Sequence, residues 1–347
     1  MDDQDSILRA VQDTFRSGLV TVIGSGLSAA SGLPSMGDLT KHLLENIDEA
    51  AFESEEAVLP IWQSIKGKLE KGAGLEAALG GANLPGPLRI AVSAQIVECI
   101  APRERDAIVG LLGQANLPPL SRLLQLLMIK DSEAEVITTN YDRLIEISAA
   151  LAQIRVDTQF YGHTLGLHDE RLSREELLSP STSRTGKKQL ETVFRPHIRL
   201  SKPHGSLDWY DLEKRAVRSE LPVTGERLVI APGADKYREG YNSPFQEHLA
   251  RANKAITNAT GFLVVGYGFN DDHLQTQLKK KFPEVPSVLI AHTLTSNAHS
   301  YLSQNSQSIG LELNPAGGTK AYRGSTQTEF SDSLWDLEGF LTKVFEK

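Results

Sequence analysis

The sequence predicts an α/β fold: a Rossmann-like parallel sheet with helices on both faces, plus a helical insertion. Two observations support this prediction. Short apolar runs typical of buried strands recur along the chain, and patterns with apolar residues three or four positions apart lie between several of them. Strands that alternate with helices form parallel β-α-β units. The 347 residues, 40% of them hydrophobic, suffice for one large domain or one domain with an insertion.

The chain begins with a helix followed by a strand. Leu8, Val11 and Phe15 recur at helical spacing, which predicts a helix over residues 5–17 that ends at Gly18. The β-branched run at residues 19–23 is the first expected strand. Further buried strands are expected in the runs EVITTN (135–140), IRLSKPHG (198–205), RLVIAPG (227–233), GFLVVGYG (261–268) and SVLIAHT (287–293).

Helical patterns separate these strands. Helices are expected over residues 121–130, 243–259 and 270–282, the second with Ser243 as N-cap and Pro244 as its first residue. A last helix is expected over Thr328–Phe345. Its apolar stripe consists of Phe330, Leu334, Leu337, Leu341 and Val344.

Residues 50–119 differ from the rest of the chain. Apolar residues recur there at helical spacing between Gly and Pro clusters, beginning with Ile61, Ile65, Leu69, Leu75 and Leu79. We therefore expect an α/β domain formed by residues 1–49 and 120–347, and a helical insertion over residues 50–119. Residues 168–190 are polar and rich in Ser and Thr, which predicts a loop with one short helix.

Composition excludes several classes of protein. The net charge of −8 without a long Lys/Arg run argues against a nucleic-acid-binding face. Cys99 is the only cysteine, which rules out an intramolecular disulfide and a thiolate-rich metal site and fits a reducing compartment. The acidic N-terminus does not look like a secretion signal, and no apolar run approaches the ~18 residues that cross a bilayer. We expect a cytoplasmic protein that does not bind membranes.

A glycine-rich stretch follows the first strand. In GSGLSAASGLP (24–34), Gly24, Gly26 and Gly32 let backbone N–H groups approach a pyrophosphate at the start of the next helix, and Ser25 and Ser28 add hydroxyl groups. An ordinary strand-to-helix turn is the alternative interpretation.

Three further motifs follow expected strands. TTNYD (138–142) places Asn140 and Asp142 at a strand end, where Asp142 is equally suited to cap the next helix. KPHG (202–205) places His204, whose imidazole can accept a proton at neutral pH, before a glycine. VVGYGFNDD (264–272) forms a glycine-rich turn with acids at the start of a helix, where capping is again the alternative.

The four motifs, in this order, resemble the sirtuin family and its bacterial sirtuin-like relatives. GSGLSAASGLP resembles the GAGxSxxSGIP signature, TTNYD the TQNxD signature, and His204 with Gly205 the catalytic His-Gly pair. The resemblance covers about residues 15–50 and 120–295. It implies NAD as a substrate, held by Gly24, Ser25, Gly26, Ser28, Gly32, Pro34, Gly266, Gly268, Asn270 and Asp271.

The resemblance also implies catalytic roles. Asn140 would position water or the nicotinamide amide, His204 would act as general base, and Asp142 would orient nicotinamide or ribose, with no metal. The chain departs from the protein deacetylases of the family: their four zinc cysteines are absent, so there is no zinc module, and Ser35, Met36 and Gly37 replace the usual Asp-Phe-Arg.

This pattern resembles the NAD-consuming effectors of bacterial anti-phage systems, some of which work beside a hexameric HerA-like ATPase. We therefore expect an NAD+ glycohydrolase that releases nicotinamide and ADP-ribose, regulated by homo-oligomerisation and by such an ATPase. Protein deacylation or ADP-ribosyl transfer, and NAD or ADP-ribose sensing without turnover, are the alternatives. The insertion is expected to present apolar surface, including Trp62 and Ile65, as an oligomer interface, or to fold back as a lid.

Overall fold

The computed structural model describes residues 3–53, 55, 57–80, 84–182, 190–221, 223–233 and 242–346. Its centre is a nine-stranded sheet with the order β16-β15-β14-β13-β12-β1-β2-β8-β3. The seven strands from β14 to β3 are parallel, and β15 and β16 continue the sheet antiparallel. In sheet order the strands are Thr326–Phe330, Thr319–Arg323, Ile309–Leu313, Ser287–Ala291, Gly261–Val265, Leu19–Ile23, Glu133–Thr138, His197–Ser201 and Arg155–Asp157.

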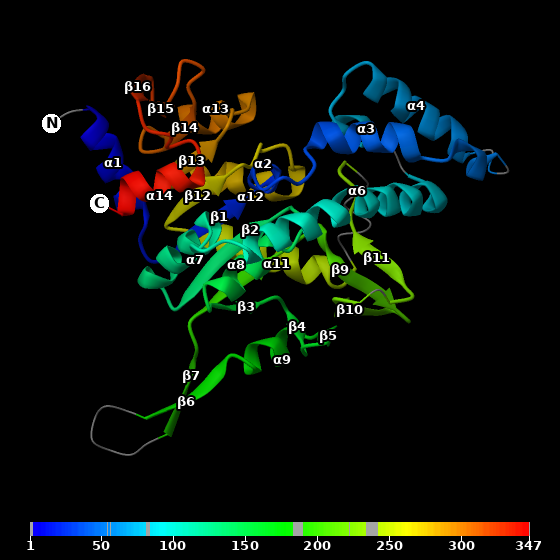
Figure 1. The fold of residues 1–347 in the computed structure, drawn as a ribbon, viewed down its shortest axis with the longest axis horizontal. Helices are drawn as coiled ribbons and strands as arrows, with labels where there is room; N and C mark the ends of the chain where they lie inside the picture. Colours follow the sequence, from blue (N-terminus) through cyan, green and yellow to red (C-terminus); the bar gives the residue numbers. More distant parts are fainter. Residues whose placement is uncertain are drawn as a thin grey trace.

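Helices cover both faces of this sheet, as predicted (Figure 1). On one face lie α1 (Asp3–Thr14), α7 (Pro119–Lys130), α8 (Leu144–Leu151) and α14 (Leu337–Phe345). On the other lie α11 (Phe245–Asn258), α12 (Asp272–Lys281), the 3₁₀ turn η2 (Phe282–Glu284) and α13 (Ser296–Ser303). All five residues of β1 are buried, and alternate side chains enter the two cores. Burial on both faces explains the continuous apolar runs of the central strands.

The helical insertion forms an arm beside the sheet (Figure 1). The chain reaches it through α2 (Ser25–Ala30) and α3 (Met36–Asn46), and it contains η1 (Glu49–Phe52), α4 (Val58–Glu70), α5 (Leu75–Leu79) and α6 (Gly86–Leu112). The expectation of exposed apolar surface at Trp62 and Ile65 is wrong, because each side chain is 1% exposed. They belong to the main core, and α4 packs against α3, α5 and α6, so this stripe is covered within the chain.

A second sheet, antiparallel and five-stranded, was not predicted. Its order is β11 (Glu226–Val229), β9 (Gly205–Leu212), β10 (Arg215–Ser219), β5 (Leu165–His168) and β4 (Phe160–Tyr161). The expected strand at 227–233 belongs to this sheet. In the polar segment 168–190 the short helix is confirmed as α9 (Glu170–Glu175), but a strand, β6 (Leu178–Thr182), follows it and pairs with β7 (Leu190–Phe194). Residues 183–189 lie outside the described residues.

Two helix boundaries differ from the predictions. Residues 326–330 form strand β16 instead of the start of the C-terminal helix, because a turn at Gly324 folds them back onto β15. The helix begins only at Leu337, where the Asp336 side chain accepts the Gly339 N–H. At α11, Pro244 is the N-cap and the Ser243 hydroxyl lies 3.0 Å from His168 Nδ1, so Ser243 does not cap the helix.

Within the described part of the chain, no helix combines the length and the apolar character that a membrane span requires.

Candidate active site

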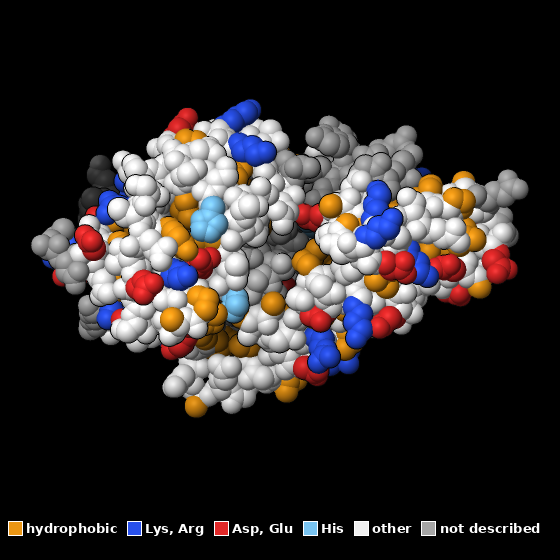
Figure 2. Space-filling view, turned by 90° about the horizontal axis from the view of Figure 1, so that it is seen from above, with side chains coloured by type: hydrophobic (Ala, Val, Ile, Leu, Met, Phe, Trp, Pro, Cys, Tyr) orange, Lys and Arg blue, Asp and Glu red, His pale blue; other side chains and the backbone are white. Residues whose placement is uncertain are grey.

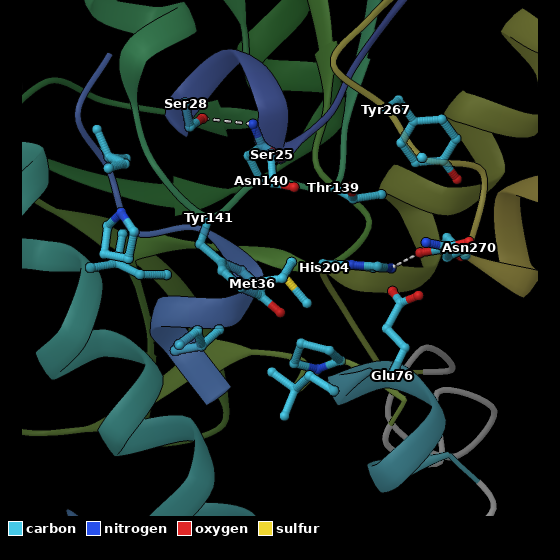
Figure 3. A pocket seen from close by; sticks show the side chains of 18 of the residues that line it. Ser25, Ser28, Met36, Glu76, Thr139, Asn140, Tyr141, His204, Tyr267 and Asn270 are labelled. Atoms are coloured by element: carbon cyan, nitrogen blue, oxygen red, sulfur yellow. Dashed lines mark hydrogen bonds and ion pairs between the residues drawn. The ribbon is translucent and has the colours of Figure 1, made fainter. Parts of the chain in front are cut away.

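The motif-bearing loops meet at the carboxyl edge of four neighbouring parallel strands, β12, β1, β2 and β8. β1 has β2 as its neighbour on one side and β12 on the other. The sheet continues from β2 to β8 in one direction and from β12 to β13 in the opposite direction. Such a reversal of strand order is where open α/β sheets bind ligands. A cavity of about 250 Å³ lies there, and Figure 3 shows side chains from several elements pointing into it.

The structure brings most of the expected site residues to this cavity. Those that line it are Ser25, Ser28, Pro34, Asn140, Asp142, His204, Gly268, Asn270 and Asp271. Gly24, Gly26 and Gly266 lie behind the lining, and Gly32 lies at the end of α2 beside two other cavities.

The glycines of the first loop are packed against the loop after β12. Gly24 N–H donates to Val265 O and Gly26 N–H to Gly266 O, both at 2.9 Å. A Cβ on Gly26 would lie 2.8 Å from Gly266 Cα. This close backbone approach is by itself a sufficient physical reason for the missing side chains, which the sequence analysis attributed to phosphate binding.

Asn140 joins the first two loops. Its Nδ2 group donates to Gly24 O at 3.0 Å and to Ser28 Oγ at 2.8 Å, which engages both amide hydrogens. The carboxamide oxygen makes no hydrogen bond to a described residue. Since Asn140 lines the cavity, this oxygen can accept a hydrogen bond from a ligand or position a water.

Asp142 belongs to the same hydrogen-bond network as Asn140 and Ser28. Its Oδ2 accepts the Ser28 hydroxyl at 2.6 Å, and its Oδ1 accepts the Leu144 N–H at 3.1 Å at the start of α8. Burial raises the pKa of the Asp142 carboxyl, an effect that the Lys202 charge and the Ser28 hydrogen bond oppose. Both oxygens thus have protein donors, so Asp142 fixes Ser28 and the helix start as well as lining the cavity.

A buried lysine supports this loop. Lys202 Nζ donates to the Asp142 carbonyl at 2.6 Å, to Ser206 Oγ at 2.9 Å and to Glu146 Oε1 at 3.1 Å, while its side chain is 1% exposed. Burial raises the pKa of Glu146, and the Lys202 charge opposes that rise. Lys202 was not among the expected site residues. Its place in KPHG, two residues before His204, was the available signal.

His204 faces the loop after β12. Its Nε2 lies 2.5 Å from Asp271 Oδ2, and the two side chains are 7% and 3% exposed. The contact has ion-pair distance, but Nε2 makes no well-directed hydrogen bond in the described part of the chain. Gly205, which follows, has a φ of +88°, and a Cβ there would clash with the Leu228 carbonyl, so the His-Gly pair requires its glycine.

The turn at residues 266–271 is strained and held in place. Phe269 has a φ of +57°, a conformation that side chains disfavour, and its ring stacks on Tyr301 with centroids 4.5 Å apart. Asn297 Nδ2 donates to Phe269 O and Asn270 Oδ1, and Thr295 Oγ1 donates to Gly268 O. The start of α13 therefore fixes the turn that supplies Asn270 and Asp271.

Acidic groups dominate the charged lining. Glu76, from helix α5 of the insertion, joins Asp142 and Asp271, and the described lining residues include no Lys or Arg. Figure 3 shows Glu76 pointing from the insertion toward His204 and Asn270. Glu76 was not among the expected site residues, because nothing in the local pattern of α5 places it near strand ends that lie more than 50 residues away in the sequence. The insertion thus forms one wall of the cavity.

The outer surface shows no comparable separation of charge on the face drawn in Figure 2. Lys/Arg and Asp/Glu side chains are intermixed there, including on the helical arm. Among the residues that the structure describes, no group of three or more His, Cys, Asp or Glu side chains is arranged to hold a metal ion.

Several solved structures resemble the chain over most of its length. The solved structures that resemble the chain include one from a study titled "Structural Basis for the Mechanism and Regulation of Sir2 Enzymes" (13% identity, 88% of this chain and 90% of that chain covered, TM-score 0.40). Another is Sir2Tm bound to a propionylated peptide (16% identity, 85% and 89% covered, TM-score 0.40). At these values the likeness is distant.

None of the curated proteins matches the chain significantly in sequence. The model of the SIR2-like domain, however, matches residues 134–293. This segment contains Asn140, Asp142, His204 and the turn at 266–271, whereas the glycine-rich loop at 24–34 lies outside it. The part of the chain that carries these motifs is therefore similar to the SIR2-like domain.

Proposed function

We propose that this protein is an NAD+ glycohydrolase, in which water replaces nicotinamide on the ribose. The observation that supports this most directly is that Asn140 and His204 reach one acid-lined cavity at the switch point of the sheet. A protein that only senses NAD needs neither a base nor a group that positions water. The match to the SIR2-like domain points to NAD as the substrate.

The cavity suits the nicotinamide riboside end of NAD+. Its volume of about 250 Å³ is below the ~300–1,000 Å³ of sites that enclose a drug-sized ligand, so it would not enclose the whole dinucleotide. The nicotinamide ring carries a positive charge, which the acidic lining favours, whereas the pyrophosphate would be repelled. We therefore place the phosphates outside, toward Ser25 and the cavity rim.

Two lining groups can bind the substrate's polar atoms. The Tyr267 hydroxyl is buried and has no hydrogen-bond partner in the described part of the chain. Burial, with the Asp271 charge as a second cause, raises the pKa of this phenol well above its ordinary value, so it remains a neutral donor. It would donate to a carboxamide or ribose oxygen of the substrate. The Asn140 carboxamide oxygen would accept from the attacking water or from the nicotinamide amide.

The chemistry follows from these placements. The bond between the ribose anomeric carbon and the nicotinamide nitrogen breaks, and the electron pair leaves with neutral nicotinamide. The ribose develops oxocarbenium character, which the acidic lining stabilises. A water oxygen then bonds to the anomeric carbon, and its proton passes to His204. The products are nicotinamide, ADP-ribose and one proton.

The test uses the purified full chain with NAD+ and measures nicotinamide and ADP-ribose by chromatography. His204→Ala should lower turnover by ~10² to 10⁴-fold, the usual effect of losing a general base. Asn140→Ala should also lower turnover, because it removes the ligand-facing oxygen and both bonds to the first loop. His163→Ala, on an exposed side chain, is the matched control. Wild-type turnover in His204→Ala would contradict the assignment.

The same assay separates the alternatives. Nicotinamide release that requires an acylated peptide would indicate deacylation, transfer of ADP-ribose to protein would indicate ADP-ribosylation, and binding without release would indicate a sensor. Release in water alone supports the glycohydrolase.

We further propose, on the sequence resemblance alone, that the enzyme is an effector of bacterial anti-phage defence that forms homo-oligomers and works with a HerA-like hexameric ATPase. An enzyme that depletes NAD+ in its own cell needs such control. Light scattering across a concentration range, and turnover with and without the ATPase, test this. A monomer that is fully active alone and indifferent to the ATPase would refute it.

A further inference from the structure

We propose that Asp271 is the positioning residue for His204: its carboxylate holds the imidazole with the proton on Nε2, so that Nδ1 is the basic nitrogen facing the substrate. This inference rests on the proposed function for its kinetic consequences, but the proton position can be tested without any activity.

His204 and Asp271 are in direct contact. His204 Nε2 and Asp271 Oδ2 lie 2.5 Å apart, between side chains that are almost fully buried. At this distance an unprotonated Nε2 would place its lone pair against the carboxylate oxygen, which is electrostatically unfavourable, whereas an N–H at Nε2 is attracted to that oxygen even though the two are not well aligned. The proton of the neutral ring therefore belongs on Nε2. His204 Nδ1 makes no hydrogen bond to a described residue, which leaves it to the substrate.

Asp271 is itself held in place by helix α12. Its Oδ1 accepts the Leu274 N–H at 3.3 Å at the start of α12, and its carbonyl accepts the Gln275 N–H at 3.0 Å. One carboxylate oxygen is thus fixed by the helix and the other is directed at His204. The loop at residues 266–271, which carries Asp271, is held by hydrogen bonds from the Thr295 and Asn297 side chains.

The Asp271 carboxylate also suits the chemistry of a general base. A general base that takes a proton becomes a cation, and a fixed carboxylate on the far side of the ring stabilises that cation. The arrangement of base and orienting acid is the one that a nucleophile or water activation requires. Asp271 acts through His204 and is not assigned contact with the reacting atoms.

Helix capping alone is the competing explanation, and two variants separate it from positioning. Asp271→Asn keeps an oxygen that can accept the Leu274 N–H but removes the negative charge beside His204. Asp271→Ser keeps a capping oxygen, since Ser is a preferred N-cap, but is too short to reach the ring. Asp13→Asn, on an exposed side chain of α1, is the matched control.

The experiment measures steady-state nicotinamide release and the ¹⁵N chemical shifts of the His204 ring, assigned by comparison with His204→Ala. We expect Asp271→Asn and Asp271→Ser to lower kcat by roughly 10²-fold or more while KM for NAD+ changes only a few-fold, because orientation of the base matters for the chemical step. The ring of the wild type should be protonated on Nε2 when neutral, and the variants should lose this preference.

Either of two results would overturn the inference. The first is wild-type kcat in both folded variants while His204→Ala is inactive, which would leave the proposed function intact and reduce Asp271 to a cap. The second is a neutral His204 protonated on Nδ1 in the wild type. If the wild type released no nicotinamide, the proposed function would fail, and the ¹⁵N measurement would still decide the role of Asp271.

Discussion

Gly26→Ala tests the contact between the two glycine-rich loops. The added Cβ would lie 2.8 Å from Gly266 Cα and 3.0 Å from Gly266 O, against an ordinary contact distance of 3.4–4 Å. The loops must therefore separate by at least about 0.6 Å, the difference between 3.4 and 2.8 Å. The contacting atoms of Gly266 belong to the backbone, so rotation of a side chain cannot relieve the clash. We therefore expect the free energy of unfolding to fall by ~1–3 kcal/mol.

The same displacement should impair catalysis. Gly266 begins the turn that carries Tyr267, Asn270 and Asp271 to the cavity. Since a misplacement of ~1 Å can cost ~10²-fold in rate, a shift of this size should lower kcat/KM at least severalfold. Thermal melting by circular dichroism and nicotinamide release measure the two effects.

Gly67→Ala is the matched control. Gly67 lies inside helix α4, and a Cβ there meets nothing within 4 Å. Alanine should therefore leave turnover unchanged and stabilise the helix by roughly 0.5–1 kcal/mol. If Gly26→Ala melted and turned over like the wild type, the packing of Gly26 on Gly266 would not be the reason for the glycine.

Two further predictions concern the buried polar groups beneath the site. Lys202→Met should destabilise the fold, by less than the ~3–5 kcal/mol typical of a fully buried pair, because it leaves Glu146, whose side chain is 20% exposed, without its charged partner. Adding Glu146→Leu should restore part of the loss. Chemical denaturation of the single and double variants checks this, and equal stability of the two would contradict it. Burial, with the charge of Arg251 as a second cause, holds the pKa of His248 well below 6.5. Below pH 6.5 the His248 side chain therefore binds a proton in the unfolded chain but not in the folded chain. The free energy of unfolding should then fall as the pH falls below 6.5, by up to ~1.4 kcal/mol per pH unit from this group. His248→Asn, which keeps an acceptor for the Lys202 N–H, should reduce that slope, and parallel denaturation curves from pH 7 to pH 5 for both proteins would refute the assignment.

Local sequence determined five strands of the central sheet, β1, β2, β8, β12 and β13, and several of its helices. The runs at residues 19–23, 261–265 and 287–291 are buried on both faces, so their apolar character is continuous and easily recognised. The resemblance to sirtuins assigned the polar residues after β2 and β8, together with the glycine-rich loops, to one site. Asn140 and His204 do line one cavity with residues of the loops at 24–34 and 266–271.

The spacing of apolar residues led to a wrong prediction near the C-terminus, where one helix-like pattern runs across a strand and a helix. Phe330, Leu334, Leu337 and Leu341 fit a helix, yet Phe330 ends a strand and only Leu337 and Leu341 lie in α14. The helical pattern of the insertion was correct, but it could not show that Trp62 and Ile65 would be buried where α4 packs against α3, α5 and α6 of the same chain. A periodic stripe reports that one face is apolar and does not report what lies against it.

Only the tertiary structure decided which groups meet across the site. Asp271 reaches His204, and Gly26 meets Gly266, because β8, β2, β1 and β12 are neighbours in that order. Glu76 enters the cavity because α5 packs beside the loop at Pro232 and Gly233. These contacts join residues tens to hundreds of positions apart, and local periodicity carries no information on strand order or on the path of an insertion. The sequence by itself therefore determined the strands β1, β2, β8, β12 and β13, several helices and the residues at the ends of these strands, and the order of the strands decided their partners.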